Sequence, residues 1–184
     1  LMRSVRYKFA HDKIQQAAYS LLPEDVRCAV HQQIGQQLLR DTPESEREQR
    51  IFDIVNPLNE SFGILGGTTD RLDLADLNLA AGLRAKASAA YDTAYNYLAF
   101  GIRLLEEDCW ESRYELALAL HTEAAEAAYL TARFEEMERL VEFVLERAGP
   151  VLDKVRSYEI KIQGYIAQAR KDEAINTALP ILRL

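Results

Sequence analysis

Histidine and cysteine are the residues of this chain whose types could perform chemistry. The three histidines are His11, His31 and His121, and the two cysteines are Cys28 and Cys109. None of them falls into an H-E-x-x-H motif or a paired-cysteine motif, which are the spacings that zinc sites use. We therefore predict no metal site and no cofactor, and we assign no catalytic residue.

A phosphate-binding loop is the next motif to test, since many ATP-binding modules carry one. The sequence has no G-x-x-x-x-G-K-[ST] element, and the adjacent Gly66 and Gly67 lack the Lys-Ser or Lys-Thr pair that should follow. His11 and Asp12 could suggest a proton relay, but an aspartate at the start of a helix is explained more simply as a cap. We expect this chain not to be an enzyme.

Acidic side chains gather at Glu135, Glu136, Glu138 and Glu142, where they alternate with apolar residues. This pattern is typical of an amphipathic helix, so we interpret the four glutamates as its solvated face.

The composition narrows the class of protein. Of the 184 residues 48% are hydrophobic and 28% are charged, which is ordinary for a soluble globular protein. The net charge of −7 argues against nucleic acid and against an anionic membrane as a partner. No apolar run reaches the roughly 20 residues of a membrane span, and no secretory signal pattern occurs. With two isolated cysteines, we expect a cytoplasmic protein with protein partners.

Helical periodicity dominates the chain and predicts an all-α fold. We expect a first helix after Asp12 and a third helix that Pro57 kinks or breaks. The second helix is expected to have an apolar stripe of Val26, Val30, Ile34 and Leu38. Thr42 is expected to cap the helix that follows it. Later helices are expected at about 71–90, 93–107, 111–130, 134–148, 151–169 and 172–184. The one strand candidate is 5–9.

Small residues recur where the first helix of a tetratricopeptide (TPR) hairpin would touch the second, at Gly82 and Ala125, whereas Ile162 stands at that place in the third pair. Ala94, Met137 and Ala174 mark equivalent positions 43 and 37 residues apart, which is longer than the 34 residues of the strict repeat. A generic antiparallel helical bundle is the alternative, since it has similar contacts. We favour antiparallel hairpins stacked as a degenerate TPR-like superhelix.

Four stretches carry a family resemblance. They are YKFAHDKIQQAAYSLLPEDVRCAVHQQIGQQLL at 7–39, RIFDIVNPLNES at 50–61, LADLNLAAGLRAKASAAYDTAYNYLAFGIRLL at 74–105 and ELALALHTEAAEAAYL at 115–130. Together they resemble the end of the ATPase module, and the helical repeats after it, in very large bacterial signalling proteins. Those proteins combine a serine/threonine kinase-like domain, an AAA/STAND-type ATPase, helical repeats, a GAF sensor and a histidine kinase.

The resemblance implies a domain division. Residues 1–41 would be a two-helix remnant of a winged-helix-like ATPase appendage, 42–70 a connecting helix and loop, and 71–184 the TPR-like repeats. The nucleotide-binding and kinase domains would lie outside this chain.

The predicted function is a non-catalytic interaction and relay module of such a signalling kinase. The alternative is a sensor that binds a small effector in the groove of the helical repeats. The repeat register places seven residues on the groove face: Lys86, Thr122, Glu126, Tyr129, Arg156, Glu159 and Gln163. Tyr129 and Arg156 are the strongest candidates, because Tyr and Arg often dominate binding energy. A plain solvated surface explains the same residues equally well.

Overall fold

Every regular element that the computed structural model describes, in residues 19–62 and 68–181, is a helix. This confirms the all-helical prediction. The strand candidate at 5–9 and the expected first helix up to residue 18 lie outside the described residues, and of its last residues Tyr19 and Ser20 are helical. The helices are α2 (Glu24–Asp41), α3 (Glu44–Arg47), α4 (Ile51–Glu60), α5 (Thr68–Ala87), α6 (Tyr91–Leu104), α7 (Cys109–Ser112), α8 (Tyr114–Leu130), α9 (Phe134–Arg147), α10 (Val151–Ala167) and α11 (Lys171–Ile181). None of these helices combines the length and apolar character needed to cross a bilayer.

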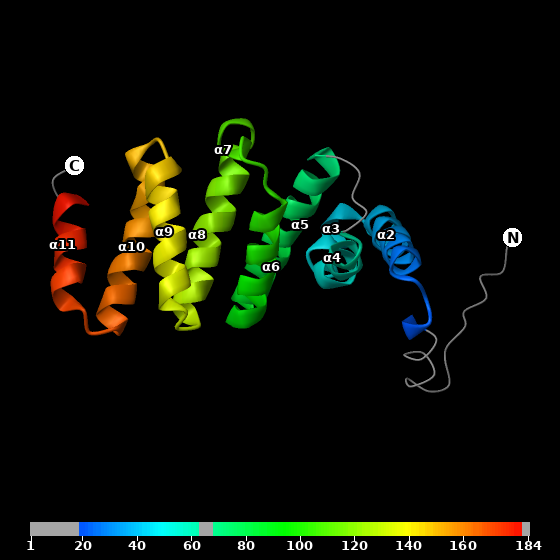
Figure 1. Ribbon diagram of the computed structural model, residues 1–184, viewed down its shortest axis with the longest axis horizontal. Coiled ribbons are helices and arrows are strands. Elements are labelled where there is room, and N and C mark those ends of the chain that lie inside the picture. Colours follow the sequence, from blue (N-terminus) through cyan, green and yellow to red (C-terminus); the bar gives the residue numbers. More distant parts are fainter. Residues whose placement is uncertain (1–18, 63–67, 182–184) are drawn as a thin grey trace, which may run out of the picture.

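The helices form a single row (Figure 1). From α5 to α11 they stand side by side as antiparallel hairpins α5–α6, α8–α9 and α10–α11, with α7 a short extra turn before α8. At the N-terminal end α2 packs against α4, and α4 packs against α5. Figure 1 shows α4 nearly end-on, so this end of the row is turned across the direction of the later helices.

The same turn closes all three hairpins. Its central residue is an alanine with a positive φ angle, 56° at Ala89, 56° at Ala132 and 60° at Ala169. The amide of the following residue then donates to the carbonyl five positions back, at 3.0 Å from Ala90 to Ala85, 2.8 Å from Arg133 to Ala128 and 2.8 Å from Arg170 to Tyr165. This left-handed cap ends one helix and starts the next. Its spacing matches that of Ala94, Met137 and Ala174, so the hairpins are structural repeats.

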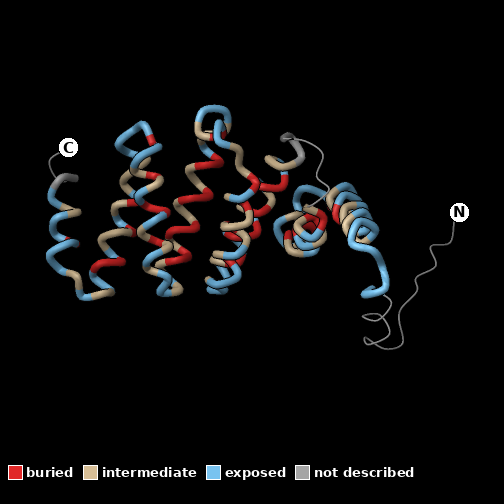
Figure 2. Tube along the Cα trace, viewed as in Figure 1, coloured by how far each residue is buried: buried red, intermediate tan, exposed pale blue. Residues whose placement is uncertain are grey.

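The core runs along the row between facing helices, as the buried segments in Figure 2 show. Glycines let neighbouring helices approach closely, and a Cβ built on Gly82 of α5 would lie only 2.5 Å from Leu98 Cγ of α6. Gly164 of α10 packs in the same way against Met137 of α9. In both pairs the space that a glycine leaves is filled by a large apolar side chain of the neighbouring helix.

Two helix boundaries differ from the sequence-based expectation. The helix expected at 111–130 is divided, because Arg113 adopts φ −138° and ψ 49° between α7 and α8. Pro57 does not break its helix, since α4 continues through it to Glu60. The proline leaves the carbonyl of Asp53 without an amide donor, but Asp53 is exposed, so water can satisfy that carbonyl.

Two expectations about the N-terminal helices are wrong. Three of the four stripe residues, Val26, Val30 and Ile34, are exposed at 40%, 41% and 45%, because α2 turns its Gly35 face toward α4, whereas Leu38 packs against the core as expected. Thr42 does not cap the following helix: it is buried at the end of α2, and its hydroxyl accepts a hydrogen bond from Arg50 at 3.2 Å.

Candidate functional site

The first helices of the three hairpins form a continuous layer, since α8 packs directly against both α5 and α10. All seven residues predicted for the groove lie on these helices, one on α5 and three each on α8 and α10. We call this surface the first-helix face and define it by Lys86, Thr122, Glu126, Tyr129, Arg156, Glu159 and Gln163. The structure tests which of these residues meet one another, whereas their binding of a partner stays a prediction.

Four of the seven residues belong to one chain of ion pairs that crosses all three hairpins. Glu126 stands at its centre, where one carboxylate oxygen accepts from Lys86 Nζ at 2.8 Å and the other accepts from Arg156 Nη2 at 2.5 Å. Arg156 also donates to Glu159 at 3.2 Å. Lys86 makes a further ion pair with Glu123. The first-helix face therefore carries a fixed ionic chain from α5 through α8 to α10.

The pairing keeps the inner members of this chain charged. Burial by itself raises the pKa of Glu126, but the hydrogen bonds from Lys86 and Arg156 outweigh it and leave that pKa below the usual range. Burial would likewise lower the pKa of Lys86, and the bonds to Glu123 and Glu126 raise it above the usual range. Arg156 and Glu159 are about half exposed, so they can contact a partner while they keep their ion pairs.

The other three predicted residues do not join the ion pairs that the structure describes. The Thr122 hydroxyl is buried and has no hydrogen-bond partner among the described residues. Tyr129 is half-buried and packs against the core, and Gln163 is exposed. The sequence analysis missed Glu123, although it lies three residues before Glu126 and so faces the same neighbouring helix, a spacing that could have identified it.

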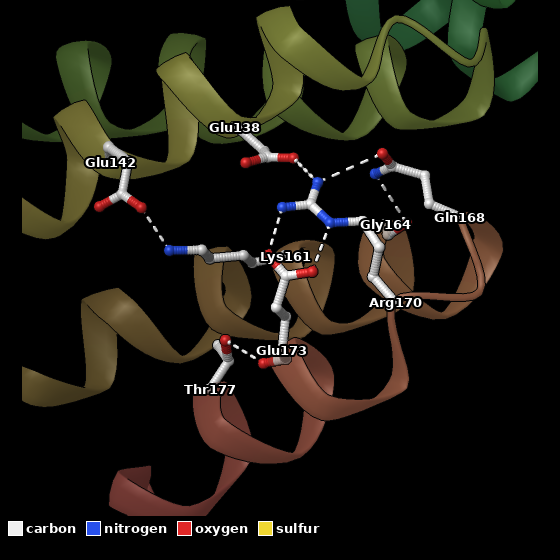
Figure 3. A network of polar contacts seen from close by, with 8 residues as sticks. All are labelled: Glu138, Glu142, Lys161, Gly164, Gln168, Arg170, Glu173 and Thr177. Carbon is white, nitrogen blue, oxygen red and sulfur yellow. Dashed lines mark hydrogen bonds and ion pairs between the residues drawn. The ribbon is translucent and has the colours of Figure 1, made fainter.

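A second set of contacts ties each hairpin to the one before it. Arg133, directly after the turn alanine of the second hairpin, binds Asp92 at 2.8 Å, and its guanidinium carbon lies 4.5 Å from the centre of the Tyr95 ring. Arg170 holds the same place in the third hairpin, where it binds Glu138 of α9 (Figure 3). An arginine after the turn therefore reaches back to the preceding hairpin in both cases.

The acidic group of α9 is consequently not a plain solvated face. Figure 3 shows Glu138 and Glu142 pointing across to Arg170 and Lys161 of the third hairpin. Arg170 also holds Glu173 of α11 through two hydrogen bonds, at 2.7 and 2.5 Å. Two of the four glutamates are thus part of the contact between hairpins.

A pocket of about 500 Å³ lies between α6 and α9, and none of the seven residues that define the first-helix face lines it. His121 of α8 lines it, stacked on Phe143 with ring centres 4.8 Å apart, and Trp110 lies 5.5 Å from the same imidazole. Nδ1 of His121 lies 2.8 Å from the carbonyl of Ala117, and burial lowers the pKa of this histidine. Burial thus favours the neutral imidazole, and the pocket joins aromatic faces with the guanidinium of Arg147.

Comparison with known proteins gives a similar signalling protein. No family model matches the chain, and no solved structure matches it. The chain is 26% identical, over an aligned length of 203 residues, to Hybrid signal transduction histidine kinase G of Dictyostelium discoideum. The alignment covers 97% of this chain but only 6% of that protein. The similarity supports a signalling-protein context for this helical array.

Proposed function

We propose that this chain is a non-catalytic protein-interaction and signal-relay module of a cytoplasmic multi-domain signalling kinase that also carries an AAA/STAND-type ATPase. The similarity to a small part of a hybrid histidine kinase supports the kinase context. The ATPase, the serine/threonine kinase-like domain and the TPR-like superhelix rest on the family resemblance of the sequence. The partner would be a neighbouring domain or another signalling protein.

The observation that carries the relay role is the ionic chain on the first-helix face. Lys86, Glu126 and Arg156 come from three different hairpins, and each holds the next. A partner that binds Arg156 or Glu159 competes for the same carboxylates and guanidinium. Binding at one hairpin would then change the contacts that set its spacing to the other two. Such a coupled surface is suited to passing a binding event along the row.

The test is the affinity of this chain for the remainder of its parent protein, measured by calorimetry. Replacing Tyr129 and Arg156 together by alanine should weaken binding by about 1–3 kcal/mol, with an unchanged far-ultraviolet circular dichroism spectrum. Arg139→Ala is the matched control, because Arg139 pairs with Glu136 on its own helix, away from the first-helix face. Equal affinity of the double variant, with loss of binding in the control, would show that the face is wrongly assigned.

A small-ligand sensor is the second candidate function, and the pocket between α6 and α9 is the observation that favours it. Its volume of about 500 Å³ falls in the range of about 300–1,000 Å³ that ligand sites usually have. Trp110, the only tryptophan of the chain, lines this pocket, so its fluorescence reports directly on occupancy. A screen of planar aromatic compounds that leaves both the fluorescence and the melting temperature unchanged would reject this candidate.

A further inference from the structure

The last hairpin of the row leaves large apolar side chains uncovered. Ile166 of α10 is 61% exposed, and Ile175 and Leu179 of α11 are 56% and 44% exposed. Ile175 and Leu179 are four residues apart, so they lie on one side of α11. We call these three residues the α11 edge.

The repeat register shows what the equivalent positions do in the earlier hairpins. Tyr95 lies six residues after the turn alanine of the first hairpin, and it contacts Arg133 of the second. Glu138 lies six residues after the next turn alanine, and it binds Arg170 of the third. Ile175 holds this same position in the third hairpin. In two hairpins, therefore, the sixth residue after the turn alanine contacts the next hairpin.

The other two residues of the α11 edge obey the same rule. Glu142, ten residues after its turn alanine, binds Lys161 of the next hairpin, and Leu179 is its equivalent. Lys86, three residues before its turn alanine, binds Glu126 of the next hairpin, and Ile166 is its equivalent. All three exposed residues therefore occupy positions that serve as contacts between hairpins elsewhere in the row.

We infer that the α11 edge is the docking surface for a further helical hairpin of the same polypeptide, and that this contact is apolar. The edge continues an interface that already occurs twice, and stacked repeats bury their hydrophobic faces on the next unit. Its chemistry is different, however, because Ile175 and Leu179 stand where the preceding hairpin has Glu138 and Glu142.

The apolar character of Ile175 and Leu179 determines which kind of hairpin can dock on the α11 edge. A cation opposite an isoleucine or leucine would lose water without gaining an acceptor, which costs free energy. The incoming hairpin should therefore carry apolar or small side chains where the third hairpin has Lys161 and Arg170. The α11 edge thereby discriminates against a second copy of the α10–α11 hairpin, which offers charged residues at both positions.

Hydrogen exchange tests the inference. The 184-residue chain is compared with a polypeptide that continues through about 40 more residues of the natural reading frame, roughly one further repeat. The α11 amides should exchange about 10-fold more slowly in the longer polypeptide. Ile175→Glu with Leu179→Glu should remove this gain, while Asn176→Glu, also an exposed site on α11, should keep it.

The double variant remains interpretable in the 184-residue chain, where both residues are exposed and its melting temperature should stay within about 2 °C of the unaltered protein. Three results would overturn the inference. The reading frame could end at Leu184, the α11 exchange rates could be equal in the two polypeptides, or the 184-residue chain could self-associate through the α11 edge while the longer polypeptide shows no added protection.

Discussion

Arg170 and Glu138 form an ion pair that fastens the turn between α10 and α11 to the side of α9. The guanidinium of Arg170 also lies 4.3 Å from the centre of the Tyr165 ring and holds both oxygens of Glu173. One side chain thus joins three helices, and it extends from a turn that the backbone fixes. It adds to the other contacts that attach the last hairpin to the row, which include the Lys161–Glu142 ion pair and the packing of Gly164 on Met137.

Replacing Arg170 by alanine should loosen that hairpin. The contacts to α9 and α11 disappear together, so local opening of α11 becomes easier. We expect the α11 amides to exchange about 3-fold faster or more, with unchanged rates in α5 and α6. Arg139→Ala removes an arginine that pairs within its own helix and serves as the control. Equal effects of the two variants on α11 would contradict this role of Arg170.

The centre of the ionic chain should matter more than an exposed glutamate. Glu126→Gln leaves Lys86 and Arg156 without their shared carboxylate, and the side chain of Glu126 is only 19% exposed. We expect a loss of about 1–2 kcal/mol in the free energy of unfolding in urea. Glu146→Gln, at an exposed site on α9, should change it by less than about 0.5 kcal/mol. Equal losses of unfolding free energy in Glu126→Gln and Glu146→Gln would show that the ionic chain contributes no more to stability than an exposed glutamate does.

Replacing a closely packed glycine by alanine should destabilise the protein by an amount that depends on the side chain facing it. A Cβ on Gly82 would lie 2.5 Å from Leu98 Cγ, a branch point that cannot move aside alone, so Gly82→Ala should cost about 1–3 kcal/mol. A Cβ on Gly164 would mainly meet the terminal methyl of Met137, which is flexible, so Gly164→Ala should cost less. Urea unfolding ranks the two variants, and a greater loss at Gly164 would refute the argument.

The turn alanines store strain that glycine should release. Ala132 has φ 56°, a region that costs an ordinary residue about 1–2 kcal/mol and glycine almost nothing. Ala132→Gly should therefore raise the melting temperature by about 2–4 °C, the shift that about 1 kcal/mol produces in a chain of this size. Ala80→Gly, at an exposed site inside α5, should lower it, since glycine weakens a helix interior. A lower melting temperature for both variants would argue against strain at this turn.

His121 should make stability depend on pH in the acidic range. Burial lowers its pKa, the bond to Ala117 opposes this in part, and Arg139 of α9 adds to the lowering. The unfolded chain therefore binds a proton more readily, so the stability that neutral His121 contributes is full above about pH 6.5 and falls as the pH drops toward the lower folded pKa. Melting temperatures of the unaltered protein and of His121→Asn between pH 7.5 and 5 check this. The melting temperature of the unaltered protein should fall further than that of the variant, and parallel curves would contradict the assignment.

The helices and their pairing could be predicted from the sequence. Apolar residues recur at helical spacing, and the equivalent positions Ala94, Met137 and Ala174 recur with the same intervals as the turns. Both are one-dimensional signals, because a hairpin is built from neighbours in the chain. The register also placed Lys86, Glu126 and Arg156 on helices that the structure brings together.

Only the tertiary structure decided which polar groups meet. The sequence analysis interpreted Glu138 and Glu142 as solvated, yet they bind the next hairpin, and it missed Glu123. Val26 and Val30 looked like a buried stripe, yet α2 turns its glycine face inward and leaves them exposed. The reason is physical. Periodicity states which side of a helix is apolar, whereas the rotation and spacing of one hairpin against the next follow from close contacts between side chains far apart in the sequence.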